Sequence, residues 1–166
     1  QFEGVERQIL PEPTGEAWTD NYIRVDVPLA ETKMGLHRRP VFAARFASRG
    51  YVVFAIDYRH APAWKWPAQL EDVQLALAWV RENGPKYGAN PAKLVLFGRS
   101  AGSQLAMVAG LQDPGVSGVI SYYGPVNLTQ GWRQPPRPDP IGSRSVLEAL
   151  IGGTPDQMPE RYQHAS

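Results

Sequence analysis

The chain has 166 residues, of which 43% are hydrophobic and 20% are charged, and this length and balance suit one globular domain. A formal net charge of +1, with Lys and Arg scattered, counts against a nucleic-acid-binding surface. The absence of Cys excludes disulfides and thiolate metal sites, and no apolar run reaches the roughly 18 residues of a membrane span.

Hydrophobic patterning predicts strands that alternate with helices. Residues 1–20 are rich in Pro, Gly and polar side chains and predict an irregular lead-in. The predicted strands cover residues 22–27, 51–56, 94–97 and 116–123, and the last three are continuous apolar runs typical of buried strands. The predicted helices cover residues 40–49, 67–84, 100–111, 143–150 and 155–164, with an irregular excursion over residues 131–142.

This order predicts an α/β fold over residues 21–166, with a mainly parallel sheet and helices on both faces. In the helix over residues 67–84, four apolar side chains recur at helical spacing and predict its buried stripe. They are Leu70, Val73, Leu77 and Val80.

A GxSxG pattern follows the predicted strand over residues 94–97, and a helix begins directly after it. In this nucleophile elbow, Ser100 is held in a strained turn that exposes its hydroxyl, while Gly98 and Gly102 avoid a collision across the turn. The amide of Ala101 then faces the oxyanion that forms when Ser100 attacks a carbonyl group. An ordinary tight turn is the alternative, and the position between strand and helix favours the elbow. No GxGxxG opens any predicted helix, which argues against a dinucleotide-binding fold.

Other polar residues have weaker signals. The three histidines are His37, His60 and His164, and each is expected to be a surface or core residue rather than a catalytic base. Three aspartates beside Pro, which are Asp113, Asp139 and Asp156, are expected to cap turns or helices. Trp64 and Trp66 suit either a substrate pocket or core packing. No carboxylate pair or His cluster has the spacing of a metal site.

Residues 24–166, and most densely residues 49–106, resemble the hormone-sensitive-lipase-like and feruloyl-esterase-like carboxylesterases of the α/β-hydrolase fold. The resemblance rests on DYRHAP at 57–62, WPAQLEDV at 66–73, the elbow, and ISYYGPVNL at 120–128. It implies a serine carboxylic ester hydrolase that acts through an acyl-enzyme on a small-molecule ester, with Ser100 as nucleophile and no metal or organic cofactor. Arylformamidase and acyl transferase activities use the same elbow and stay open.

Three departures from that family follow. Between the strand resembling residues 24–27 and the helix around Pro40, relatives carry a further strand and its HGG oxyanion turn, and this segment has no counterpart here. Relatives also often have an acidic residue where this chain has Arg99. The family's triad acid and histidine are expected beyond Ser166. For this chain taken alone, the sequence therefore favours a catalytically incomplete fragment or a non-catalytic hydrolase-like protein, and little or no activity is expected of it. Without the missing strand, either strand 51–56 pairs directly with strand 94–97 or strand 22–27 moves between them, and one sheet edge is left exposed.

Overall fold

The computed structural model describes residues 22–25, 45–47 and 49–166, so the predicted lead-in over residues 1–20 lies outside the described residues. The chain divides into two compact units. The first unit consists of residues 1–59 and 74–91, and the second consists of residues 60–73 and 92–166. Helix α2 (Ala68–Asn83) contributes to both units, and its predicted stripe of Leu70, Val73, Leu77 and Val80 is buried, which confirms that prediction.

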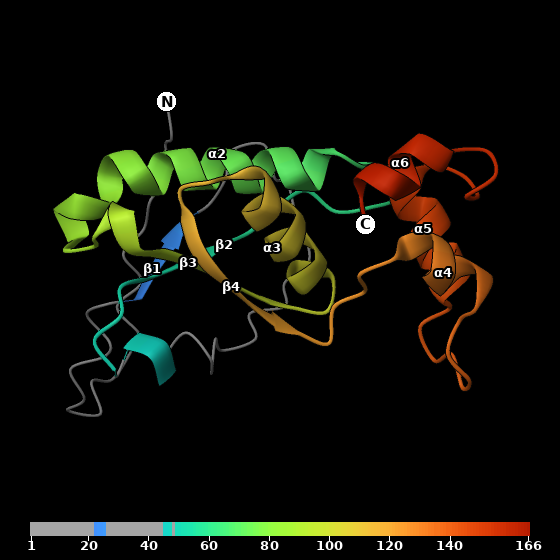
Figure 1. Ribbon diagram of the computed structural model, residues 1–166, viewed down its shortest axis with the longest axis horizontal. Coiled ribbons are helices and arrows are strands. Elements are labelled where there is room, and N and C mark those ends of the chain that lie inside the picture. The colour runs from blue at the N-terminus through green and yellow to red at the C-terminus, as the bar shows by residue number, and fades with distance from the viewer. Residues whose placement is uncertain (1–21, 26–44, 48) are drawn as a thin grey trace. The chain divides into compact units, whose positions relative to one another are not determined.

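The first unit contains a pair of parallel strands and an aromatic cluster. Strand β1 (Tyr22–Val25) pairs with β2 (Val53–Ile56), with Tyr22 opposite Val53 (Figure 1). The ring of Phe54 lies edge-on to Trp79 of α2 and to Tyr87 of the 3₁₀ helix η2 (Gly84–Tyr87), with centroids 6.0 and 6.1 Å apart. Tyr58 follows β2, and the burial of its side chain raises its pKa. The neighbouring Asp57 carboxylate raises it further, by a smaller amount.

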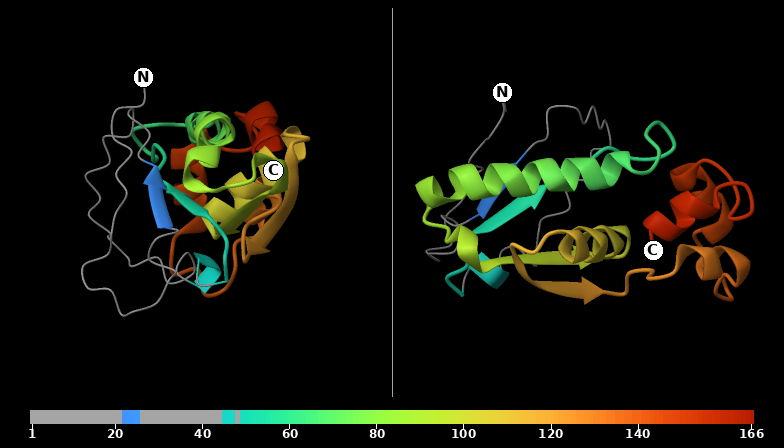
Figure 2. Two further views of the ribbon diagram at one scale, coloured as in Figure 1. Left: turned by 90° about the vertical axis from the view of Figure 1, so that its left-hand side faces the viewer. Right: turned by 45° about the horizontal axis from the view of Figure 1, so that its top comes forward.

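The second unit is built on another parallel pair. A short 3₁₀ helix, η3 (Pro91–Lys93), leads into β3 (Leu94–Arg99), which pairs with β4 (Val116–Tyr122). Helix α3 (Ala101–Gln112) connects the two strands and packs against both (Figure 2). A Cβ at Gly110 would overlap the side chain of Val119, so glycine allows α3 to approach the strands closely.

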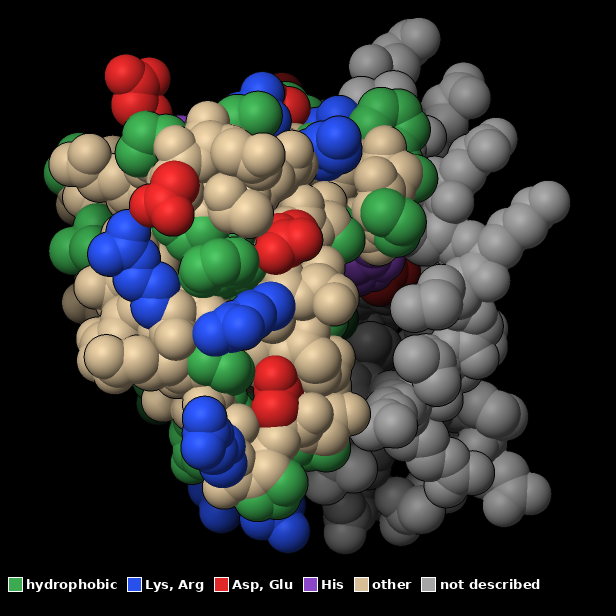
Figure 3. All heavy atoms as spheres, turned by 90° about the vertical axis from the view of Figure 1, so that its right-hand side faces the viewer, with side chains coloured by type: hydrophobic (Ala, Val, Ile, Leu, Met, Phe, Trp, Pro, Cys, Tyr) green, Lys and Arg blue, Asp and Glu red, His purple; other side chains and the backbone are tan. Residues whose placement is uncertain are grey.

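Three short helices complete the second unit: α4 (Leu128–Arg133), α5 (Ser143–Ile151) and α6 (Pro159–His164). We call them the helical group. Leu128, Ile151 and Tyr162 are its largest fully buried side chains. Asn127 caps α4 by accepting a hydrogen bond from the Gln130 amide at 2.8 Å. The face in Figure 3 carries interspersed basic and acidic side chains around small apolar areas, as ordinary water-exposed surfaces do.

The strand pairing differs from the prediction. Within the described residues, β2 pairs with β1 and β3 pairs with β4, in two separate two-stranded sheets. Neither of the two expected arrangements, direct pairing of β2 with β3 or β1 placed between them, is found among the described residues, where β1 pairs with β2 alone.

The predicted burial of residues 116–123 is also wrong. Val119 is 37% exposed and Tyr122 is 46% exposed, because β3 is the only strand partner of β4 in the part of the chain that the structure describes. The apolar run predicts burial, but burial also needs a cover on each face of the sheet. The predicted exposed sheet edge is present at this strand.

Some helix boundaries shift. Helix α4 begins before the predicted irregular excursion and includes its first three residues, whereas residues 134–142 are irregular apart from single turns. Helix α6 begins at Pro159 rather than Pro155, since residues 155–157 form a turn. No helix among residues 45–47 and 49–166 is both long and apolar enough to cross a membrane.

Candidate active site

Ser100 is the residue between the end of β3 and the start of α3, two elements that Figure 1 shows. Its backbone has φ 52° and ψ −124°, a region that residues with a side chain rarely occupy. Its N–H donates to the carbonyl oxygen of Tyr122 at 3.0 Å, while its own carbonyl oxygen accepts from Ser103 N at 3.0 Å. These bonds join the end of β4 and the first turn of α3 to one exposed serine. Strained backbone of this kind is concentrated at functional sites.

The two glycines of the turn have different roles. A Cβ at Gly98 would overlap the carbonyl group of Gly102, so the chain can turn this tightly only without a side chain at Gly98. A Cβ at Gly102 would meet nothing within 4 Å. The expectation that Gly102 also avoids a collision is therefore wrong. The backbone of Gly102 lies close to Gly98, but a side chain at Gly102 would extend into open space.

Ala101 is the first residue of α3 and is exposed. The first N–H groups of a helix have no acceptor within the helix, so this amide can donate to a bound group. The N-terminal end of a helix also carries a partial positive charge that favours an anion. No acidic residue lies in the first turn of α3 to offset this charge. The surroundings of Ser100 therefore suit negative charge.

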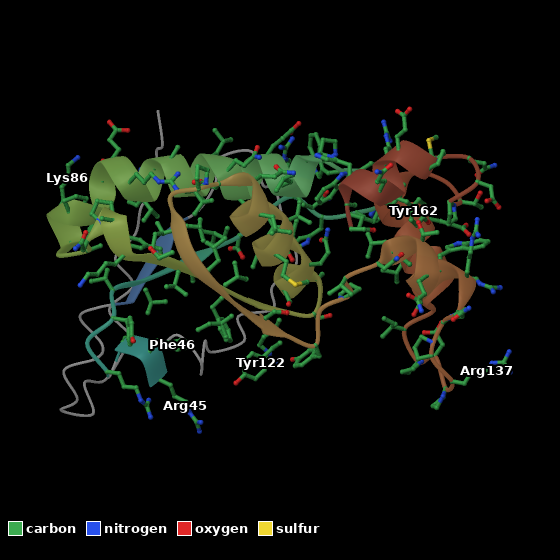
Figure 4. All side chains as sticks on the ribbon, viewed as in Figure 1. Arg45, Phe46, Lys86, Tyr122, Arg137 and Tyr162 are labelled. Carbon is green, nitrogen blue, oxygen red and sulfur yellow. The ribbon has the colours of Figure 1, made fainter. Side chains whose placement is uncertain are left out.

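Arg99 and Tyr123 form a contact beside Ser100 that sequence reasoning missed. The Nε of Arg99 donates to the phenol oxygen of Tyr123 at 2.6 Å, and the guanidinium carbon lies 5.5 Å from the ring centroid. Tyr123 follows Tyr122, which Figure 4 shows at the end of β4. Like Ser100, Tyr123 has a positive φ, here 42°. The two consecutive tyrosines at the end of a predicted strand could have drawn attention to this position. Their pairing with Arg99 could not be predicted, because it depends on the register of β3 and β4.

Buried polar contacts support the elbow. The hydroxyl groups of Ser103 and Ser121 lie 2.5 Å apart and join α3 to β4, and Ser103 is fully buried. A Cβ at Gly124 would overlap the Ser103 side chain, so the segment after β4 passes close to α3. The amide of Gln104 donates to the carbonyl oxygen of Ala165 at 2.5 Å. The first turn of α3 is thus fixed from two sides.

Trp64 and Trp66 lie in different surroundings. Trp66 is 2% exposed, and its indole N–H donates to Nδ1 of His164 at 3.0 Å. Its backbone N–H donates to the carbonyl oxygen of Leu150 at 2.8 Å. Trp66 therefore packs in the core of the second unit. Trp64 is 44% exposed and is the one of the two that presents a ring surface to solvent.

The ring contacts of His164 are with residues other than Ser100. Both ring nitrogens of His164 have other neighbours, because Nδ1 accepts from Trp66 and Nε2 lies 3.5 Å from the Gln112 amide. His60 is half-buried, and its carbonyl oxygen accepts from Trp64 N. His37 lies outside the described residues. The role of base is therefore not assigned to any of the three.

Two of the three candidate aspartates cap local structure, as expected. Asp113 accepts from the Gly115 amide at 2.9 Å, and Asp139 accepts from the amide and the hydroxyl of Ser143 at the start of α5. Asp156 instead forms an exposed ion pair with Arg133 at 2.9 Å. No group of three or more His, Asp or Glu within the described ranges could hold a metal ion.

The sequence of this chain is similar to those of proteins named as esterases. The sequence pattern of the BD-FAE family matches residues 29–166. Esterase LipC of Mycobacterium tuberculosis is 32% identical over 138 residues, which cover 74% of this chain and 33% of LipC. Esterase LipQ of the same organism is 34% identical over 134 residues, which cover 73% of this chain and 29% of LipQ. The chain thus spans about a third of the length of these curated relatives.

Two solved structures share the fold. An esterase of Pyrobaculum calidifontis aligns with a TM-score of 0.56 and 26% identity, over 72% of this chain and 44% of that one. A truncated carbohydrate esterase from gut microbiota aligns with a TM-score of 0.58 and 22% identity, over 72% of this chain and 50% of that one. These likenesses confirm the predicted fold class, an incomplete α/β-hydrolase with parallel strands and helices.

Proposed function

Because this chain belongs to the BD-FAE family, we propose that the protein is a serine hydrolase of carboxylic esters and that Ser100 is its nucleophile. One observation carries the proposal. Ser100 is held with a positive φ between the end of a parallel strand and the start of a helix, and its amide is bonded to the neighbouring strand. This is the position in which an α/β-hydrolase exposes a nucleophile.

The proposed reaction has two steps. The Ser100 oxygen attacks the ester carbonyl carbon, the carbonyl π electrons move onto oxygen, and a base takes the hydroxyl proton. The oxyanion collapses, expels the alcohol, which takes up the proton, and leaves an acyl-serine. Water then attacks the acyl group by the same route and releases the carboxylic acid and free Ser100. The chain's own contribution is the Ala101 amide and the N-terminal end of α3, which stabilise the oxyanion in both steps.

The base and the acid of the triad are proposed to lie outside these 166 residues. LipC and LipQ are about three times as long as the part of them that this chain covers. His164 is committed to Trp66 and Gln112, so it would have to leave its hydrogen bond to reach a reacting serine. The substrate proposed is a small-molecule ester, and a net charge of +1 without a basic cluster argues against nucleic acid as a partner.

Both ring nitrogens of His164 already have other neighbours. This favours a second candidate function for the chain taken by itself, that of a hydrolase-like protein without turnover. Losing only the histidine of a serine hydrolase costs about 10⁶ in kcat. In that case the elbow would keep its shape, and Ser100 would react far more slowly than in a full triad. Cleavage of a formamide instead of an ester is a variant within the same reaction class.

Turnover of paired substrates tests the proposal. A short-chain nitrophenyl ester and a formanilide would be incubated with the chain, with Ser100→Ala and with Ser145→Ala, whose serine is exposed on α5. Because the base is proposed to lie outside these 166 residues, we expect only slow release, faster from the ester than from the formanilide. It should be lost with Ser100→Ala and unchanged with Ser145→Ala. Equal ester release with and without Ser100 would refute the nucleophile. Preference for the formanilide would indicate an amide-cleaving enzyme, and no release from either would favour the second candidate.

A further inference from the structure

We propose that Arg99 and Tyr123 are positioning residues that clamp the elbow and so fix the orientation of Ser100. The clamp is the side-chain contact between these two residues, which lie at the carboxyl ends of β3 and β4. Its catalytic consequence rests on the proposed function. Its structural content, that the pair holds the Ser100 amide on β4, stands independently.

The clamp lies beside two residues with strained backbone conformations. Among the described residues, Ser100 and Tyr123 are the two non-glycine residues with positive φ, at 52° and 42°. They lie on either side of one hydrogen bond, from Ser100 N to the carbonyl oxygen of Tyr122. Such conformations persist only where the surrounding contacts fix them. The side chain of Arg99, directly before Ser100, makes such a contact with Tyr123.

Arg99 contacts Tyr123 in two ways. Its Nε donates to the phenol oxygen at 2.6 Å, a short bond of the charge-assisted kind. Its guanidinium carbon also lies 5.5 Å from the ring centroid, within the range of a cation–π interaction. Arg99 pairs with Tyr122 in the strand register, so the clamp extends the pairing of β3 with β4 one residue past the last backbone pair.

Besides the backbone pairing, a ring contact of Tyr122 with Phe97, with centroids 5.7 Å apart, helps to hold this end of the sheet. Tyr122 and Tyr123 are exposed, and Val119 and Ile120 behind them are partly exposed, so burial does little to hold the end of β4. The inner connection is the hydroxyl pair of Ser103 and Ser121. The clamp is the outer connection. Without it, the carbonyl group of Tyr122 can swing away, and the amide of Ser100 then loses its acceptor.

The first test is amide hydrogen exchange resolved by residue on the full 166-residue chain. Arg99→Gln and Tyr123→Phe each remove the hydrogen bond, and each should speed exchange at the Ser100 amide about five- to tenfold. The double variant should exchange no faster than Arg99→Gln alone, because Arg99→Gln already removes the whole contact. Arg99→Lys, which keeps the charge and one donor, should recover part of the protection.

A matched control comes from the same unit. Arg144 also stacks on an aromatic ring, with its guanidinium carbon 5.0 Å from the centroid of Trp132, but it lies on α5. Arg144→Gln should leave exchange at Ser100 unchanged. The clamp is refuted if Ser100 exchange stays within twofold of the parent in both single variants. It is also refuted if the two effects add in the double variant, or if all amides of β3 speed up equally.

A second measurement separates the clamp from the proposed function. With a fluorophosphonate probe, loss of the clamp should lower the maximal rate of Ser100 labelling several-fold and leave the half-saturating concentration unchanged, since neither residue is proposed to touch the probe. If exchange behaves as predicted but no form is labelled, the clamp stands and the proposed function fails for this chain. If every variant is labelled at the parent rate and exchange is unchanged, the clamp fails and the nucleophile stands.

Discussion

The elbow and the helical group belong to the same unit but are ordered by different means. At the elbow, Ser100 is exposed and strained, and it is held by backbone hydrogen bonds and by a glycine that allows a tight turn. In the helical group, Ile151 and Tyr162 are fully buried, and side chains accept hydrogen bonds from backbone amides at the starts of α4 and α5. The comparison indicates that packing in one region stabilises the unit while the other keeps an unfavourable conformation available for chemistry.

The largest expected effect is the loss of packing in the helical group. Ile151→Ala should lower the free energy of unfolding by about 2–5 kcal/mol, because Ile151 is fully buried at the end of α5. Urea denaturation would measure it. The control is Ile141→Ala, since Ile141 is 68% exposed and its loss should change stability by no more than about 0.5 kcal/mol. Equal costs for the two changes would mean that the helical group is not the packed region.

A smaller effect is expected from crowding the elbow. Gly98→Ala should cost about 1–3 kcal/mol and disturb the position of Ser100, because its Cβ would overlap the backbone of Gly102. Gly118→Ala on β4 is the control, since a Cβ there meets nothing within 4 Å. Thermal unfolding and the rate of Ser100 labelling would be measured for both. If alanine at 98 is tolerated as well as alanine at 118, the turn is looser than described.

Tyr162 gives the packed region a dependence on pH. The pKa of Tyr162 is raised from the ordinary 10.0 to about 12. Burial is the larger cause, and the negative charge of the nearby Glu148 is the smaller one. A raised pKa means that the unfolded chain loses this proton first, so stability falls as pH rises from about 10 to about 12. The Tyr162→Phe variant has no phenol at this position, so its stability should not fall with pH for this reason. It also lacks the bond from the phenol to Gly153 O, which contributes about 1 kcal/mol at neutral pH.

Urea unfolding of both forms from pH 7 to pH 12 would check this prediction. The parent should be the more stable form at neutral pH, and its advantage should shrink or reverse above pH 10. A constant difference across that range would show that the Tyr162 phenol titrates no differently in the folded and unfolded states.

The smallest effect is expected from the caps. Asp139→Ala should cost about 1 kcal/mol, because its carboxylate accepts from the amide and the hydroxyl of Ser143 at the start of α5. Asp156→Ala removes only the exposed ion pair with Arg133 and should cost less than about 0.5 kcal/mol. Thermal unfolding of the two variants would separate them. A larger loss with Asp156→Ala would contradict the assignment of Asp139 as the cap.

The sequence predicted what local patterns determine. The turn after β3 was predicted because its glycines lie two positions on either side of Ser100 in the chain, and the buried stripe of α2 followed from helical spacing. An exposed sheet edge was expected, but that β4 would form it was not predictable, because the burial of a strand depends on which strands and helices cover it. The contact of Trp66 with His164 joins residues 98 positions apart, and the clamp needs the register of β3 and β4. No local pattern encodes such contacts.

The central claim is that Ser100 is the nucleophile, and mapping a covalent adduct tests it most directly. The chain would be incubated with a fluorophosphonate probe and digested with trypsin, which cleaves after Arg99 and leaves Ser100 as the first residue of its peptide. Fragmentation of that peptide should place the adduct on Ser100, and Ser100→Ala should carry none. An adduct on Ser103 or Ser121, or equal labelling of the Ser100→Ala chain, would contradict the account.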